Sequence, residues 1–256
     1  MTLIFNNIVA IFRKELQGYF KSSLAYIIAG VFWFSVCAFS VAEVRTWIEL
    51  KAAGHMVDVP QESLKSFLSV MFWIVIFIVP SLSMGLYAEE RRHRTLELLA
   101  TSPITNWAVA VGKLLALWTL FITMMLPVGI LEVVFLSYAD PPMAPGVFVV
   151  GHLGLFLLAA TISSLGLFIS SIADSSFLAI ILTYALIFIL FWLFVLGEQW
   201  GEPWETLFSQ MSFFKHYATL TQGVLDMSSV VSFASYILLG LFLTAQSIDL
   251  LRFQRR

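Results

Sequence analysis

The chain alternates between long apolar runs and shorter polar connections. Six of the runs are long enough to cross a bilayer as helices, since about 20 helical residues span its hydrocarbon core. None shows the every-second-residue alternation of a membrane β-barrel strand. The pattern therefore predicts an all-α polytopic membrane protein with transmembrane helices over Leu24–Ala42, Phe67–Tyr87, Ala108–Tyr138, Val147–Ile172, Phe177–Leu196 and Val230–Leu251.

Two stretches are predicted to lie outside the spans. The third apolar run is too long for one straight crossing and contains Pro127, so its early part, Trp107–Lys113, is predicted to approach the membrane rather than cross it. The connection Glu43–Ser66 contains Gly54 and Pro60 and little apolar surface, which predicts a loop.

The last large connection, Gly197–Ser229, is unusually aromatic for a loop. Trp and Tyr favour the headgroup depth of a membrane, so we expect short helices at this interface. The residues behind the prediction are Trp200, Trp204, Leu207, Phe208, Met211, Phe213, Phe214 and Tyr217. No internal repeat or low-complexity tract divides the chain, which predicts a single transmembrane domain over residues 1–256.

The N-terminal segment Leu3–Lys21 has the period of an amphipathic helix. We predict a helix lying in the cytoplasmic interface with its basic residues toward lipid headgroups. The alternative is a cytoplasmic extension of the first span. The apolar positions at helical spacing are Ile4, Ile8, Ile11, Phe12, Leu16, Tyr19 and Phe20.

Composition supports the membrane interpretation. Of the 256 residues, 60% are hydrophobic and 12% are charged, against about 25% charged in an average soluble domain. So few charges cannot cover the surface of a water-soluble globule. A net charge of −2 without a basic patch gives no support for nucleic-acid binding. The single cysteine, Cys37, lies in an apolar run and is expected to be a small buried packing residue.

The distribution of Lys and Arg predicts the orientation. With six spans, ten basic residues fall on the side of both termini and four on the other, so both termini are predicted to face the cytoplasm of a bacterial inner membrane. Ser40-Val41-Ala42 resembles a signal-peptide cleavage site, but about 20 residues containing Glu15 precede the apolar run, so we expect no cleavage.

Common catalytic and ligand motifs are missing from the sequence. Gly112-Lys113 is followed by Leu114 and lacks the earlier glycine of a phosphate-binding loop, so the chain is predicted to bind no ATP by that route and not to be an enzyme. No zinc motif or nucleophile elbow occurs, and no metal site is predicted. The four histidines, His55, His93, His152 and His216, are expected to be solvated or interfacial.

Glu132 is the one clear ionisable residue within a predicted span, and such residues are often functional. Two interpretations remain open. Glu132 either belongs to a pathway or pairs with His152, which is expected at a similar depth, or it extends toward the outer interface. The absence of a chain of buried acids argues against a proton-driven carrier.

The connection Ala88–Asn106 carries the most informative pattern. Glu90 and Arg94 form a favourable i,i+4 pair, a leucine edge follows, and Pro103 ends the predicted short amphipathic helix. Physical chemistry alone leaves a solvated linker and an element that docks into a partner's groove equally open.

This connection resembles the signature of the ABC-2 type permease family, in which acids precede a Thr-Leu-Glu-Leu-Leu stretch and a Ser-Pro pair. The matching residues are Glu89, Glu90, Thr95, Leu96, Glu97, Leu98, Leu99, Ser102 and Pro103; Arg94 stands where the family has glycine. Two weaker similarities involve Arg13-Lys14-Glu15-Leu16 with Tyr19-Phe20, and Phe214–Tyr217 with Gln222–Asp226, the latter as in the GldF-like and NosY-like branch.

The resemblance implies an ATP-driven transporter. It also implies export as the direction of transport, on family grounds and not from particular residues. Two six-helix permeases, as a homodimer or with a paralogue, would each seat a coupling helix on a separate ABC ATPase subunit that binds ATP and Mg. That helix would include Arg91 and Arg94 beside the matching residues. An accessory periplasmic-domain protein is a further implied partner, and the chain itself would bind no cofactor.

Other functions stay open on the sequence alone. A secondary ion-coupled carrier would work without an ATPase, a membrane-embedded enzyme or haem-handling protein would need a ligand constellation, and a related complex could transmit force or signals. If the coupling interpretation is right, reversing Glu90 or Glu97 to Lys uncouples ATP hydrolysis from transport while the protein still inserts.

Overall fold

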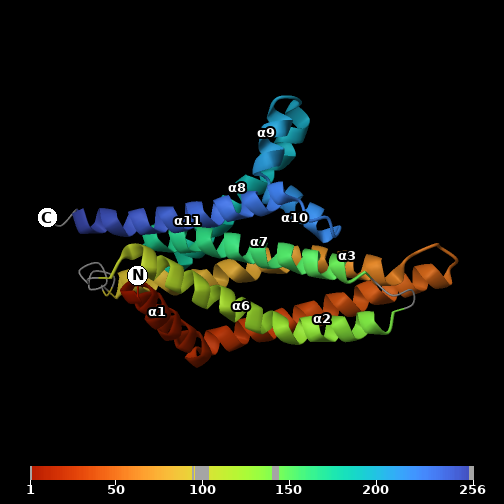
Figure 1. The fold of residues 1–256 in the computed structure, drawn as a ribbon, viewed down its shortest axis with the longest axis horizontal. Helices are drawn as coiled ribbons and strands as arrows, with labels where there is room; N and C mark the ends of the chain where they lie inside the picture. Colours follow the sequence, from red (N-terminus) through yellow and green to blue (C-terminus); the bar gives the residue numbers. More distant parts are fainter. Residues whose placement is uncertain (1, 94, 96–103, 140–143, 254–256) are drawn as a thin grey trace.

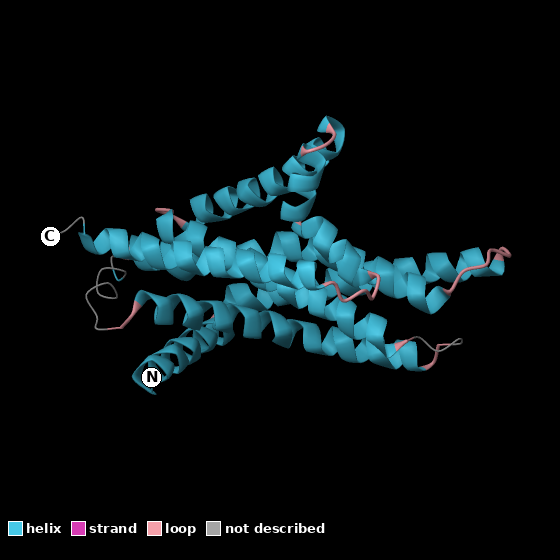
Figure 2. Ribbon diagram, turned by 45° about the horizontal axis from the view of Figure 1, so that its top comes forward, coloured by secondary structure: helices cyan, strands magenta, loops and turns pink. Residues whose placement is uncertain are grey.

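The protein is described here by a computed structural model covering residues 2–93, 95, 104–139 and 144–253. All regular structure in these residues is helical, with no strand (Figure 2). The helices are α1 (Thr2–Lys21), α2 (Ser23–Ala52), α3 (Val59–Ser83), α4 (Gly85–Arg92), α6 (Asn106–Ser137), α7 (Pro145–Ile172), α8 (Ser176–Trp200), α9 (Trp204–Met211), α10 (Phe213–Thr221) and α11 (Met227–Phe253).

Six helical segments within the described residues are long and apolar enough to cross a membrane: α2, α3 with α4, α6, α7, α8 and α11. The predicted all-α, six-span fold is therefore confirmed, and the chain is a multi-pass membrane protein. The helix ends differ from the prediction at the first connection. The predicted loop Glu43–Ser66 is wrong, because α2 continues to Ala52 and α3 begins at Val59. Polar residues there extend the helices beyond the apolar stretch.

The third apolar run forms one helix, α6, from Asn106 to Ser137, which includes Trp107–Lys113 and Pro127. Its 32 residues exceed the length of one crossing, and the placement of Trp107–Lys113 outside the crossing stays a prediction. Transmembrane helices tolerate an internal proline, since neighbouring groups can satisfy the freed carbonyl. The Thr105 side chain begins the helix by accepting a hydrogen bond from the Ala108 N–H at 3.4 Å, as an N-cap threonine does.

The long helices form an elongated bundle in which both termini lie at one end (Figure 1). We call this the termini end; it also holds the end of α4, the start of α6 and the turn between α7 and α8. α7 is the central helix, with 78% of its apolar window buried, against 17% for α2 and 19% for α8. α11 packs closely on α7: a Cβ on Gly240 would lie 2.7 Å from the Ser164 backbone.

The N-terminal amphipathic helix is confirmed as a helix, α1, and it is separate from the first span. The break falls at Ser22, whose extended backbone separates α1 from α2, and the two helices meet at a pronounced angle (Figure 1). α1 packs against α6, where a Cβ on Gly112 would meet Ile11 at 2.9 Å and the Ile8 carbonyl at 3.1 Å. The alternative of a straight extension of the first span is therefore excluded.

The predicted short helices in Gly197–Ser229 are confirmed as α9 and α10. α9 projects away from the bundle with the end of α8 (Figures 1 and 2). The end of α8 and α9 share an aromatic cluster in which the Trp204 and Phe208 ring centroids lie 5.9 Å apart and Trp200 is 6.2 Å from Phe208. Such rings suit the boundary between headgroups and hydrocarbon.

Candidate functional site

The second span bends at Met84, where α3 ends and α4 begins. A side chain of α7 holds this bend: the Ser170 hydroxyl accepts from the backbone N–H groups of Tyr87 and Ala88, each at 3.1 Å, and donates to the Met84 carbonyl at 2.9 Å. These bonds satisfy backbone groups at a helix start that have no partner within α4. The direction of α4, and so of the connection Ala88–Asn106, is thereby fixed to the central helix.

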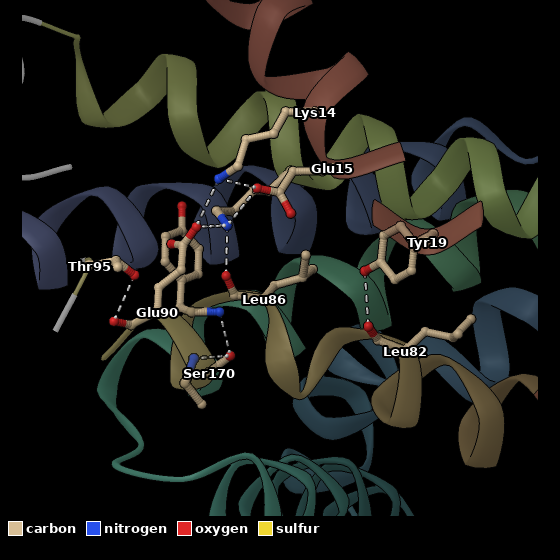
Figure 3. Close-up of polar contacts among 11 residues, drawn as sticks. Lys14, Glu15, Tyr19, Leu82, Leu86, Glu90, Thr95 and Ser170 are labelled. Atoms are coloured by element: carbon tan, nitrogen blue, oxygen red, sulfur yellow. Dashed lines mark hydrogen bonds and ion pairs between the residues drawn. The ribbon is translucent and has the colours of Figure 1, made fainter. Parts of the chain in front are cut away.

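Lys113 of α6 pairs with Glu15 and Glu90 at the centre of a buried ionic cluster, and Figure 3 labels the partners Glu15, Glu90 and Lys14. Its Nζ lies 2.9 Å from Glu90 Oε1 and 3.1 Å from Glu15 Oε1, and it donates to the Leu86 carbonyl at 2.6 Å. The Lys113 side chain is 1% exposed, and its Nζ lies 4.7 Å from the centre of the Tyr87 ring.

Lys14 completes the cluster at its solvent edge. Its Nζ lies 3.4 Å from Glu15 Oε1 and 3.5 Å from Glu90 Oε1, and its side chain is 69% exposed. Partial burial opposes the charged form of Lys14, but the carboxylates of Glu15 and Glu90 outweigh it and raise the pKa of Lys14 above its usual value. Two ammonium groups and two carboxylates therefore balance, and they join α1, α4 and α6.

Arg91 anchors the end of α4 to the end of α7. Its guanidinium donates to the carbonyls of Ser171 and Ile172 at 3.2 and 3.1 Å and pairs with Asp174 at 3.1 Å. The carbonyls at a helix C-terminus lack intrahelical donors and carry partial negative charge, so a cation there is favourable. Together with Ser170, this contact holds α4 against α7 along its length.

The return side of the connection is anchored as well. Asn106, the first residue of α6, donates from Nδ2 to Asp249 Oδ1 of α11 at 2.5 Å. Trp107 packs beside Phe242 with ring centroids 6.3 Å apart. Both flanks of the connection are therefore held by polar contacts to the bundle.

The structure separates the predicted coupling residues that it describes into an inward and an outward group: Glu90 points into the ionic cluster, whereas Glu89 and Thr95 are exposed. Of the residues predicted on the interfacial helix, Glu15 joins the cluster and Arg13 is exposed. Thr95 donates to the Glu90 carbonyl at 3.2 Å. The remaining predicted coupling residues lie outside the described part of the chain: Arg94, Leu96, Glu97, Leu98, Leu99, Ser102 and Pro103. The predicted Glu90–Arg94 pair is therefore not described.

Glu132 of α6 and His152 of α7 meet in the half of the bundle away from the termini end. Glu132 Oε2 lies 3.1 Å from His152 Nε2, and each side chain is 10% exposed. The imidazole packs against Phe148, 4.1 Å between ring centroids, and its Nδ1 lies 3.0 Å from the Phe148 carbonyl. Because a carbonyl only accepts, this contact places a hydrogen on Nδ1.

The Glu132–His152 pair lacks a well-formed hydrogen bond. Their charged atoms are within ion-pair distance, yet both Glu132 oxygens and His152 Nε2 are buried without a hydrogen-bond partner in the described surroundings. We regard the contact as a charge contact without hydrogen-bond geometry. With Nδ1 protonated, Nε2 and the carboxylate oxygens are all acceptors unless one further proton or donor lies among them. The nearby Tyr217 hydroxyl is already engaged with the Leu68 carbonyl at 2.5 Å.

Several expectations from the sequence are corrected here. His152 and His216 are not solvated, since both are 8% exposed; His216 contacts the Ser229 hydroxyl and the Gln210 carbonyl. Glu132 is not the one ionisable residue buried in a span, because Lys113 is buried more completely. Cys37 is exposed rather than buried.

Sequence reasoning missed Lys113, Ser170 and Asp249 as anchoring residues. Lys113 could have been recognised from the sequence, because placing a lysine beside a long apolar run in a membrane is energetically costly unless the lysine is paired. Ser170 gives no such signal, since serine is common in membrane helices and its role depends on the bend that it meets.

These features define a class: a multi-pass α-helical membrane subunit whose second span ends in a helix anchored to its neighbours. Comparison with protein families gives the family itself. The model for the ABC-2 family transporter protein matches residues 42–248, so the chain belongs to the ABC-2 transporter family and is a transmembrane permease of an ABC transporter. A search of curated proteins gave no match. The family resemblance is thus confirmed, while the GldF-like and NosY-like branch stays a prediction.

Membership in the ABC-2 family also indicates the class of the partner protein. A permease of this family is a non-catalytic membrane subunit that works with an ABC ATPase subunit. The matched residues include the connection Ala88–Asn106 and the Glu132–His152 pair, whereas the Arg13–Glu15 similarity lies before them.

Proposed function

We propose that this permease exports its substrate, driven by ATP that a separate ATPase subunit binds and hydrolyses with Mg, and that the connection after α4 receives the ATPase. The observation that carries the proposal is the buried ionic cluster, because it ties the base of this connection to two other helices. Lys113 bridges Glu90 of α4 and Glu15 of α1 within hydrogen-bond distance. Separating these charges in a buried setting is costly, so α1, α4 and α6 are expected to move together.

The outward group supplies the contact surface in this proposal. Glu89, Arg92 and Thr95 are exposed beside the inward cluster, so a partner's groove can approach α4 without breaking the cluster. Glu97 and the leucine edge, known only from the sequence, extend the same segment. A displacement that the ATPase imposes here passes to α1 and α6 through Lys113.

The assembly and orientation follow from the same proposal. Two copies of the chain, or one copy with a paralogue, each seat on one ATPase subunit in a bacterial inner membrane. Both termini, the end of α4 and the start of α6 lie at the termini end (Figure 1), and the excess of Lys and Arg on that side supports a cytoplasmic location. An accessory periplasmic-domain protein would contact the opposite end.

The structure revises the test of coupling. Glu90→Lys would place a third ammonium beside Lys14 and Lys113, so it is expected to prevent folding rather than to uncouple the subunits. Glu89→Lys changes an exposed side chain instead. The matched control is Glu205→Lys, an exposed acid on α9 at a distance from the connection.

The experiment purifies the tagged chain with its ATPase from native membranes and reconstitutes the complex in lipid nanodiscs. We expect an ATPase with a phosphate-binding loop to co-purify, and Glu89→Lys to weaken its retention while Glu205→Lys does not. Purification without any such ATPase would favour the ion-coupled carrier. Equal retention by both variants would contradict the assignment of the contact to α4.

A further inference from the structure

An apolar groove lies between α2, α3 and α6 in the half of the bundle away from the termini end. Its volume is about 600 Å³, within the range of about 300–1,000 Å³ typical of small-molecule sites. Val36, Leu64, Phe67, Val128 and Phe135 are among the side chains that line it. All three helices belong to candidate membrane spans, and on α2 the groove extends from the apolar stretch at Val36 to the polar end at Glu43 and Glu49.

The groove is elongated along α2. Its lining on that helix extends from Val36 to Glu49, a rise of about 20 Å at 1.5 Å per residue. One leaflet contributes about half of a hydrocarbon core roughly 30 Å thick. The groove is therefore long enough for one lipid chain lying parallel to the helix.

Two polar side chains in the groove have no hydrogen-bond partner. Glu132 lines the groove, and both of its carboxylate oxygens are buried and unpartnered among the described residues. The Ser63 hydroxyl lines the same groove and is equally without a partner. Buried acceptors without a donor are costly, so these atoms call for a donor that a ligand can bring. Glu132 also lies 3.1 Å from His152 Nε2, so a donor from a ligand would add a hydrogen bond to this charge contact.

The charges at the rim favour a cation. Arg45 is neutralised by Glu49 at 2.7 Å, whereas Glu43 forms no ion pair with any residue that the structure describes. Among the acids that line the groove, Glu43 therefore remains unpaired in the described part of the chain, and the charge contact of Glu132 is with His152. Lipid tails are as apolar as the groove, so transfer of a chain from the bilayer gives little driving force. The selectivity of the groove must therefore come from its contacts with the lipid headgroup.

We propose that this groove binds one aminophospholipid from the bilayer, with an acyl chain parallel to α2 and its primary ammonium at Glu132 and Ser63. The N–H groups of the ammonium supply the donors that these oxygens lack, and its charge offsets the acids. The site goes beyond the coupling function, because it needs no ATPase and lies at the opposite end of α6 from Lys113.

The test titrates the purified full-length chain in detergent with three phospholipids that share the same acyl chains. Phosphatidylethanolamine has a primary ammonium, phosphatidylcholine keeps the charge without N–H donors, and phosphatidylglycerol has neither. Native mass spectrometry measures the bound lipid. A charge-assisted hydrogen bond is expected to make phosphatidylethanolamine bind about tenfold more tightly than the others. Glu132→Gln removes this preference and Ser63→Ala reduces it, while the distant Glu205→Gln retains it.

A second readout places the lipid in the groove. Cys37 is the one cysteine in the sequence, is exposed and lines the groove, so alkylation by an apolar maleimide reports on its access. Saturating phosphatidylethanolamine is expected to slow this alkylation, and Ser40→Trp, which fills the groove, to abolish the slowing. Equal affinity for the three lipids, an unchanged preference in Glu132→Gln, or unaltered Cys37 alkylation would each overturn the proposal. None of these results bears on retention of the ATPase, which is measured at the other end.

Discussion

Replacing Lys113 with methionine tests whether the ionic cluster holds α1, α4 and α6 together. Lys113→Met keeps the length of the side chain but leaves the carboxylates of Glu15 and Glu90 without their buried cation, and removing one partner of a buried pair costs about 3–5 kcal/mol. The Glu15 and Glu90 side chains keep 14% and 18% exposure. Lys14 stays 3.4 and 3.5 Å away. We therefore expect the lower part of that range, about 3 kcal/mol.

Thermal unfolding of the purified chain in detergent, followed by helical circular dichroism, measures this loss. Lys14→Met is the matched control, because a pair that is 69% exposed on one side contributes less than about 1 kcal/mol. Adding Glu15→Gln and Glu90→Gln to Lys113→Met removes the unpaired charges and is expected to restore most of the stability. The reasoning fails if Lys113→Met is as stable as Lys14→Met, or if the triple variant is the least stable of the set.

Two further changes test local contacts. Gly112→Ala brings a Cβ to 3.1 Å from the Ile8 carbonyl, which is expected to cost about 1–3 kcal/mol and to make α1 more sensitive to limited proteolysis; Gly18→Ala, with no atom within 4 Å, should not. The Ser228 hydroxyl and backbone N–H lower the pKa of Asp226, so its stabilising effect is complete above the usual carboxyl pKa and lost as pH falls through the lowered one. Asp226→Asn should abolish this loss of stability, measured as the unfolding temperature between about pH 5 and pH 2. An unfolding temperature that falls with pH in Asp226→Asn as it does in the unmodified protein would contradict the prediction.

The sequence predicted the number of spans well, because the length of an apolar run is set by the thickness of the bilayer. It located helix ends poorly for the same reason. A helix need not end where the hydrocarbon ends, and α2 continues through Glu43, Arg45 and Glu49 to Ala52. The i,i+4 ion pair between Arg45 and Glu49 at 2.7 Å is typical of a helix that continues into water. The apolar stretch therefore locates the membrane crossing but not the two ends of the helix.

The candidate sites could be predicted only in part. Glu132 and His152 were recognised as residues of similar depth, and the structure brings them within 3.1 Å, although their role stays a prediction. The ionic cluster was not recognised, because its members come from residues 15, 90 and 113, and only the packing of α1 on α6 brings them together. A short local motif identifies the connection, whereas the contacts that hold it depend on tertiary packing.

The two polar sites lie on one helix, and this placement gives α6 a specific mechanical role in the proposed function. Lys113 and Glu132 are 19 positions apart (132 − 113) on α6, about 28 Å at 1.5 Å per residue, which is close to the hydrocarbon thickness. Movement of the ionic cluster is therefore expected to reach the groove along a continuous helix. Pro127 interrupts the hydrogen-bond ladder five residues before Glu132, and a proline is a common place for a helix to bend. The bend would change the groove between α2, α3 and α6 without requiring the whole span to move.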